Sequence, residues 1–257
     1  MKKVFFIAMA ILFTGSAVAL DNVPKSGTSI QTNIGFNVSN LKNFPSYNNK
    51  VGGNLGFKME FMLPNAYGTY INLGLDYTHK GARVTSIETY DLSGYAISDM
   101  DAYTEDEIST GEVTRKFQAH YFSIPIHIGY RYNLSEKFGV YGEIGPYLAL
   151  GIAGKYRKNF EDAGFDNLSE NVFGKHAAKL YLDKTYNNIR TFRRFDGGLG
   201  FRVGAEYNNQ YSLNFGYDWG MADIYTQKYR KKQKVDHDIT LPKLKNHNLS
   251  ITFGYRF

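Results

Sequence analysis

Charged side chains recur on the polar face of segments that otherwise alternate between apolar and polar residues. Such groups could form ion pairs, transfer protons or line an ion path. The bases on this face are Lys58, Lys80, Arg131, Arg194, Arg202 and Arg256, and the acids are Glu60, Asp76, Glu143, Asp196, Glu206 and Asp218. Their balance favours a network of ion pairs, because buried charges are tolerated when they are paired and hydrogen-bonded. We predict a pair between Arg131 and Glu143, which flank one tight turn. A narrow proton or ion path and a gated pore are the alternatives.

A basic run near the end of the chain has a different chemistry. It consists of Lys228, Arg230, Lys231, Lys232 and Lys234. Clustered ammonium and guanidinium groups bind phosphates and other anions, so we predict an anion-binding loop here. The alternative is a solvated loop attracted to the segment 83–116, in which acids outnumber bases.

The remaining reactive residue types show no arrangement typical of catalysis or of metal binding. The six His residues have no recognised metal-ligand spacing, and the chain has no Cys. The glycines of residues 197–204 do not make a phosphate-binding loop, because no helical pattern follows them. We therefore expect a protein that is not an enzyme and that holds no metal and no cofactor.

The first residues predict export. Lys2 and Lys3 precede a short apolar run, and residues 17–19 have the small-x-small pattern of a cleavage site. We predict a signal peptide over residues 1–19, cleaved between Ala19 and Leu20, and a single domain over residues 20–257. An uncleaved anchor is the alternative. In an exported protein, the net charge of +6 favours lipid phosphates or surface acids as partners over nucleic acid.

Eight segments with period-two alternation position the charges described above. They span about residues 29–39, 51–63, 70–80, 119–132, 138–153, 191–207, 211–221 and 246–257. Alternation places one face of each strand in an apolar medium and the other in a polar one. Short connections alternate with long ones, which is typical of an outer-membrane barrel with short periplasmic turns and long external loops. A soluble barrel of the lipocalin kind would alternate with the opposite orientation.

The last segment decides between these two orientations. It alternates strictly and ends on Phe257. A soluble protein rarely finishes on an exposed edge strand with a large aromatic residue, whereas a closed barrel pairs its last strand with its first. The predicted fold is an eight-stranded, antiparallel, up-and-down transmembrane β-barrel in the outer membrane of a Gram-negative cell. We expect the barrel-assembly machinery to bind it through this C-terminal strand.

A family resemblance supports this fold. The run YFSIPIHIGYRYNLSEKFGVYGEIGPYLALG at residues 121–151, together with IGFNVSNL, LDYTHKGA, FDGGLGFRVGAEY and LSITFGYRF, resembles the outer membrane protein beta-barrel domain family, also described as PorT-like or porin-family. Its most distinctive parts are Ile124-Pro125 and the group Glu143, Gly145, Pro146 and Tyr147. The resemblance implies an eight-stranded outer-membrane barrel and assigns no activity.

Three functions remain open for such a barrel. The leading hypothesis is a non-enzymatic membrane anchor whose surface loops serve in binding or assembly. The second is a small porin-like channel or a transport or secretion component. A lipid-modifying enzyme is least favoured, because the lipid-facing side chains are almost all apolar or aromatic. The expected partners are outer-membrane lipid, lipopolysaccharide bound by the basic run, and an unidentified surface or secretion partner.

Overall fold

Strand pairing continues around the molecule until the sheet meets itself. The computed structural model describes residues 27–42, 48–64, 66–91, 108–161, 168–174, 190–238 and 240–257. The strands are β1 (Gly27–Lys42), β2 (Asn48–Met62), β3 (Thr69–Asp91), β4 (Ile108–Asn133), β5 (Phe138–Glu161), β6 (Leu168–Asn171), β7 (Phe195–Tyr207), β8 (Tyr211–Gly220) and β9 (Lys245–Arg256), and the helix is α2 (Gln227–His237).

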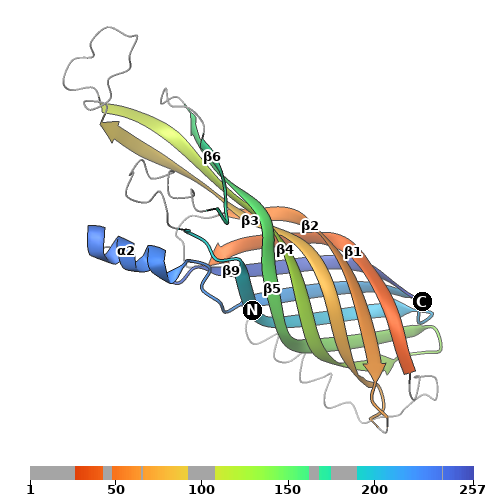
Figure 1. Cartoon of the computed structure of the whole chain (residues 1–257). Coiled ribbons are helices and arrows are strands. Elements are labelled where there is room, and N and C mark those ends of the chain that lie inside the picture. The colour runs from red at the N-terminus through yellow and green to blue at the C-terminus, as the bar shows by residue number, and fades with distance from the viewer. Residues whose placement is uncertain are drawn as a thin grey trace, which may run out of the picture.

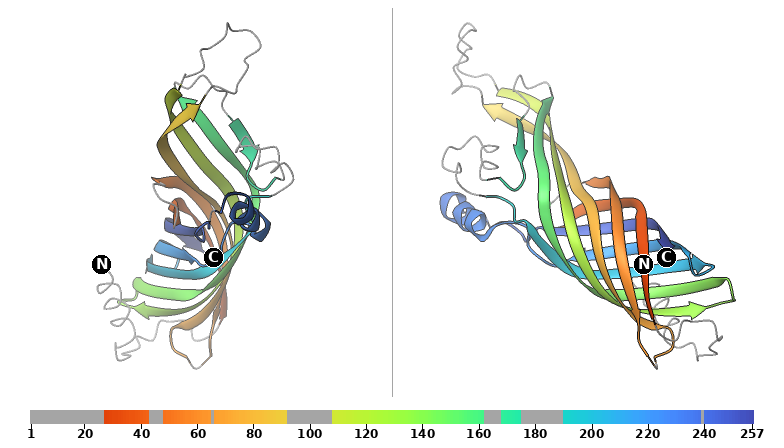
Figure 2. Two further views of the ribbon diagram at one scale, coloured as in Figure 1. Left: turned by 90° about the vertical axis from the view of Figure 1, so that its left-hand side faces the viewer. Right: turned by 45° about the vertical axis from the view of Figure 1, so that its right-hand side comes forward.

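Eight of these strands form a closed ring. β1 lies between β2 and β9, and β4 pairs with both β3 and β5, always antiparallel. Figure 1 and Figure 2 show the resulting tilted barrel, with β6 paired to the upper part of β5 outside the ring. Closure pairs the backbone groups that lipid could not satisfy. The predicted fold class is confirmed.

No helix among the described residues is both long enough and apolar enough to cross a membrane.

Short turns lie at one end of the barrel, which we call the periplasmic end. They join β2 to β3, β4 to β5, and β7 to β8. In the last of these turns, Asn208 and Asn209 have positive φ angles of 52° and 56°, a conformation that asparagine tolerates better than most residues. The backbone N–H of Arg256 donates to the carbonyl of Gln210 over 2.7 Å, so the end of β9 is tied to this turn.

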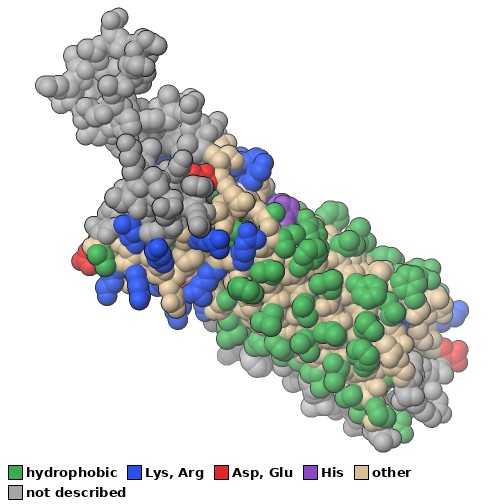
Figure 3. Space-filling model, viewed as in Figure 1, with side chains coloured by type: hydrophobic (Ala, Val, Ile, Leu, Met, Phe, Trp, Pro, Cys, Tyr) green, Lys and Arg blue, Asp and Glu red, His purple; other side chains and the backbone are tan. Residues whose placement is uncertain are grey.

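The outer wall of the barrel is a band of exposed apolar side chains. Alternate residues of each strand point outward, among them Leu73 and Leu75 on β3 and Ile124 and Ile126 on β4. In Figure 3 apolar side chains cover the visible barrel wall, and Lys and Arg side chains gather beyond them at the opposite, external end. So large an apolar surface fits contact with lipid, and its orientation is the reverse of that in a soluble barrel.

Three strands continue well past the segments that alternation predicts. β3 and β4 stay paired through their outer halves, and β5 stays paired with β4 up to Glu161 (Figure 1). The prediction of long loops is therefore wrong for the described parts of segments 81–116 and 154–161. The strands continue because Val84, Val113 and Phe117 are buried on one shared side of this extension.

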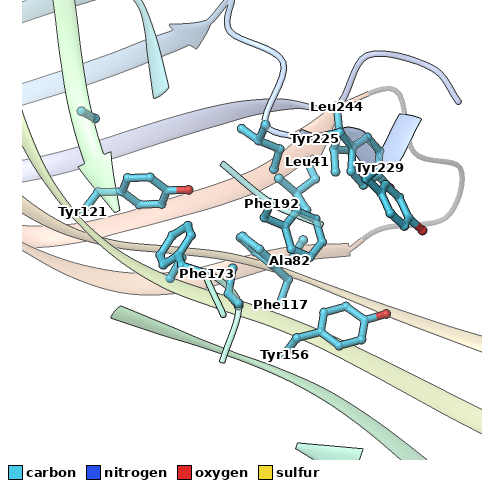
Figure 4. Packing of buried hydrophobic residues seen from close by; sticks show 14 of the residues in the cluster. Leu41, Ala82, Phe117, Tyr121, Tyr156, Phe173, Phe192, Tyr225, Tyr229 and Leu244 are labelled. Carbon is cyan, nitrogen blue, oxygen red and sulfur yellow. The ribbon is translucent and has the colours of Figure 1, made fainter. Parts of the chain in front are cut away.

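An apolar cluster fills the external end of the barrel, and we call it the external cap. Figure 4 shows how its aromatic rings pack; Phe192 stacks on Tyr225 with ring centroids 5.6 Å apart. Its members come from the strands, from the turn after β6, from the segment before β7, and from α2 with the segments on either side of it. They are Leu41, Ala82, Phe117, Ala119, Tyr121, Tyr147, Ala149, Tyr156, Val172, Phe173, Phe192, Ile224, Tyr225, Tyr229 and Leu244.

Candidate functional site

Four charged side chains lie at the periplasmic end of the lumen, where Arg131 and Arg256 also line a cavity of about 180 Å³. Arg131 Nη2 lies 2.7 Å from Glu60 Oε2, and Arg131 Nε lies 2.8 Å from Glu206 Oε1. Arg256 lies 3.0 Å from each of the same two carboxylates. The residues come from β4, β9, β2 and β7, so this group crosses the lumen. Two guanidinium groups therefore balance two carboxylates, which is the condition for keeping such charges buried.

Glu143 is the centre of a second group, in the middle of the barrel. Its carboxylate accepts hydrogen bonds from Tyr70 Oη and Asn72 Nδ2, both over 2.9 Å. Lys58 Nζ lies 3.4 Å away and His127 Nδ1 lies 3.5 Å away. All five side chains are buried. A carboxylate held by this many donors is a structural centre of the network.

A third group lies further toward the external end. Arg202 Nη2 is 2.6 Å from Asp218 Oδ1, and Asn248 donates to the other oxygen of Asp218 over 3.1 Å. Asp76 and Lys58 join Arg202 and Asp218 in lining a cavity of about 30 Å³. That volume corresponds to about one water molecule. The third group thus leaves little free space in the lumen.

The last charged pair lies directly beneath the external cap. Lys80 Nζ is 3.3 Å from Asp196 Oδ2, and Asn246 donates to the same oxygen over 3.0 Å. The Lys80 ammonium also faces the rings of Tyr121 and Tyr147, with 5.4 Å and 5.0 Å to the ring centroids. The charged network is therefore in direct contact with aromatic residues of the external cap.

Two predictions about individual lumen residues are wrong. Arg194 lies outside the lumen: it is exposed, donates to the Gly151 carbonyl over 3.2 Å and packs over the Phe173 ring. The strand β7 begins only at Phe195, and side-chain alternation applies only within a strand. Arg131 does not pair with Glu143 either, because each finds its partners on other strands across the lumen.

The remaining predicted lumen residues all take part in the groups described above. Their chemistry is that of a filled, charge-balanced interior, as expected for an eight-stranded barrel. Among the described residues, no three His, Asp or Glu side chains are grouped to hold a metal ion.

The predicted anion-binding loop is a helix. Lys228, Arg230, Lys231, Lys232 and Lys234 all lie on α2. Arg230 is engaged within the protein: it donates to Asp223 Oδ2 and to the Leu241 carbonyl, both over 2.6 Å. Lys232 is half-buried, whereas Lys228, Lys231 and Lys234 are exposed. The structure thus brings three of the five cations to the surface.

The helix α2 is not predicted from the sequence because it has almost no apolar periodicity. Among the side chains of α2 that the structure describes, Tyr229 and Gln233 are buried, one turn apart. The available signal was Thr226, whose hydroxyl accepts a hydrogen bond from the Tyr229 backbone N–H as a helix N-cap.

The predicted signal peptide, with its cleavage site between Ala19 and Leu20, lies outside the described residues.

Fold and lumen together define a transmembrane β-barrel whose interior is occupied by side chains. The chain belongs to the outer membrane protein beta-barrel domain family, whose model matches residues 21–226. The family resemblance seen in the sequence is thus confirmed, and the protein is an outer-membrane barrel. A search of curated proteins finds no match.

Solved structures of other outer-membrane barrels are similar only at a distance. Ail of Yersinia pestis, in complex with the heparin analogue sucrose octasulfate, shares 14% identity, covers 90% of this chain and 99% of its own, and gives a TM-score of 0.36. Neisserial surface protein A shares 12% identity with 90% and 98% coverage and a TM-score of 0.39. The barrel domain of Pseudomonas aeruginosa OprF shares 8%, with 90% and 99% coverage and a TM-score of 0.32. Similarity at this level does not assign any property of these proteins to the present chain.

Proposed function

We propose that this protein is a non-enzymatic outer-membrane anchor that presents a basic helix at the cell surface for binding. The barrel holds the chain in the membrane, and the exposed lysines of α2 bind an anionic ligand. The ligand chemistry we propose is the phosphorylated sugar of lipopolysaccharide. The observation that carries the proposal is that Lys228, Lys231 and Lys234 are exposed on a helix that is itself fixed to the barrel.

The attachment of α2 supports this role. Asp223 accepts from Arg230 through Oδ2 and from the backbone N–H groups of Tyr225 and Leu244 through Oδ1. Tyr229 is buried and contacts Tyr225, with ring centroids 5.6 Å apart. A helix held at both its side chains and its flanking backbone loses little conformational freedom when a ligand binds.

The spacing of the exposed lysines supports it as well. Lys228, Lys231 and Lys234 follow one another at intervals of three, and residues three apart are neighbours on a helix surface. Like charges at this spacing weaken a helix slightly. An anion bound between them would remove that cost.

The test is the salt dependence of binding. The protein in phospholipid nanodiscs is titrated with the lipid-free oligosaccharide of lipopolysaccharide at 0.1 M and at 1 M salt. Because the screening length falls from about 10 Å to about 3 Å over this range, we expect the wild-type affinity to fall at least tenfold. The variant K228Q/K231Q/K234Q should bind at least tenfold more weakly at 0.1 M, which corresponds to about 1.4 kcal/mol.

The matched control is Lys137→Gln, which removes an exposed charge from a periplasmic turn and should leave the affinity unchanged. An affinity that ignores salt, or a triple variant that binds like the wild type, would rule out α2 as the site.

Export and assembly belong to the same proposal. We infer cleavage between Ala19 and Leu20 and recognition of β9 by the barrel-assembly machinery, with the outward aromatic residues Phe253 and Phe257 as the contact. Crosslinking in intact outer membranes, followed by mass spectrometry, tests for a surface or secretion partner. A stoichiometric protein attached to the external end would replace lipopolysaccharide as the proposed ligand.

A further inference from the structure

Three cations face one another across neighbouring strands on the outside of the molecule. Arg83 on β3 is paired in register with Lys116 on β4, and Lys116 is paired in register with Arg157 on β5. Arg83 and Arg157 are exposed, and Lys116 is half-buried. We call Arg83, Lys116 and Arg157 the basic row.

Lys50 of β2 extends this row. A side-chain carbon at Gly81 would lie only 2.8 Å from Lys50 Cδ, so the Lys50 side chain crosses β3 over this glycine. Lys50 is partly buried, and the charges of Arg157 and Lys116 act on it. Lys50 therefore lies within electrostatic reach of the row.

The basic row has no acidic partner among the described side chains. None of its three members forms a salt bridge there. On the same face, Glu112 is four positions from Lys116 along β4, which is about 13 Å in an extended strand. Like charges directly opposite each other destabilise a sheet. Within the described part of the chain, the arrangement is thus unfavourable unless an anion joins it.

The row lies on the lipid-facing side of the barrel, on the external side of the apolar band. On β5 the exposed apolar residue Ile152 precedes Arg157 by five positions, about 16 Å along the strand. With the tilt of about 40° usual in such barrels, this corresponds to a height of about 12 Å. Long basic side chains can bend back toward the membrane over several ångströms, so the row reaches the layer of lipid headgroups.

We propose that the basic row is a docking site for a phosphate group on the sugar headgroup of an outer-leaflet glycolipid. The acyl chains of that lipid would lie against the apolar band, while its phosphate would be held by Arg83, Lys116 and Arg157. Lipid is the occupant because this charged surface continues the apolar surface on the same three strands. The basic row lies on β3, β4 and β5, so it is separate from the lysines of α2. The inference rests only on the placement of the barrel in the membrane.

The experiment measures binding and melting of the purified protein in an uncharged detergent. The probes are lipid A with its phosphates, lipid A without them, and inorganic phosphate at equal concentration. We expect phosphorylated lipid A to raise the melting temperature of the wild type clearly, and the other two probes to do so little or not at all. The triple variant R83Q/K116Q/R157Q should bind phosphorylated lipid A at least tenfold more weakly.

The melting temperature without lipid separates docking from a structural role. Removing opposed like charges should leave the triple variant as stable as the wild type or more stable. A triple variant that is less stable without lipid would overturn the proposal, because it would mean that the row has partners inside the protein. If the triple variant does not assemble, Arg157→Gln alone should still weaken binding severalfold, and undiminished binding would overturn the proposal.

Two controls assign the source of the effect. The variant K228Q/K231Q/K234Q should keep its full affinity for lipid A, and a loss there instead of in the basic row would overturn the proposal while leaving α2 as the anion site. Stabilisation by inorganic phosphate equal to that by lipid A would overturn docking of a lipid.

Discussion

At the scale of single residues, Arg131 has the most demanding position in the lumen. Its guanidinium contacts Glu60 and Glu206, which lie on strands to either side of the lumen, and only 3% of the residue is exposed. Arg256 touches the same carboxylates, and its side chain is more exposed. The charge balance of the periplasmic end thus depends on both arginines, with Arg131 the more buried of the two.

The substitution Arg131→Ala should lower the free energy of unfolding of the barrel by about 3–5 kcal/mol, because it leaves buried carboxylate charge without its partner. Unfolding of the protein in detergent by urea, followed by tryptophan fluorescence or gel mobility, measures this loss.

The comparison variant is Lys137→Ala, which removes an exposed base a few residues further along the chain and should change the stability by less than about 0.5 kcal/mol. Equal stabilities of the Arg131 and Lys137 variants would refute the importance of the lumen pairs.

At the scale of elements, one acid, Asp223, takes part in attaching α2 to the barrel. Asp223 accepts hydrogen bonds from Arg230 and from two backbone N–H groups on either side of the helix. The helix itself is rich in lysine and has no acidic residue in its first turn, so it lacks the charge pattern that stabilises helix N-termini. Its order therefore rests on tertiary contacts.

The substitution Asp223→Ala should detach α2 while the barrel stays intact. Trypsin cleaves after lysine, so cleavage at Lys228, Lys231 and Lys234 should become at least several times faster, and the melting temperature of the barrel should not change. Mass spectrometry of the fragments over time gives the cleavage rates of the wild type and of the variant.

Glu136→Ala, which removes an exposed acid from a periplasmic turn, serves as the control and should not alter cleavage. Cleavage of α2 at the wild-type rate in the Asp223 variant would show that this acid does not anchor the helix.

At the scale of the whole molecule, two kinds of side chain occupy the barrel interior along its axis. Ion pairs and their hydrogen-bond partners occupy the lumen from the periplasmic end to Lys80 and Asp196. Beyond them, the external cap fills the barrel with aromatic and aliphatic side chains (Figure 4). Such a filling argues against the channel hypothesis, because an ion would have to displace both paired charges and packed apolar groups.

In planar lipid bilayers, the purified protein should therefore show no steady open level. The variant F192A/Y225A weakens only the cap, and it should also remain closed because the charged groups still occupy the lumen. A reproducible open level for the wild type would restore the channel as the leading function, and an open level for the variant alone would make the cap the barrier.

Much of the architecture can be predicted from alternation. A strand in a closed barrel has one face in lipid and one in the lumen, so period-two patterns identify the strands, their outward residues and the charged inward set. Lys58, Glu60 and Glu143 are buried where the pattern predicts them. This succeeds because the pattern is local: each residue's face depends only on its position in its own strand.

The tertiary structure alone decides which charges meet and what fills the external end. Arg131 pairs with Glu60 and Glu206 instead of Glu143, because side chains from distant strands converge across a narrow lumen. The continuation of β3, β4 and β5, the external cap and the anchoring of α2 by Asp223 likewise depend on contacts between segments far apart in sequence. Such contacts produce no periodic pattern in the sequence, whereas the alternation of apolar and polar residues shows which side chains face lipid and which face the lumen.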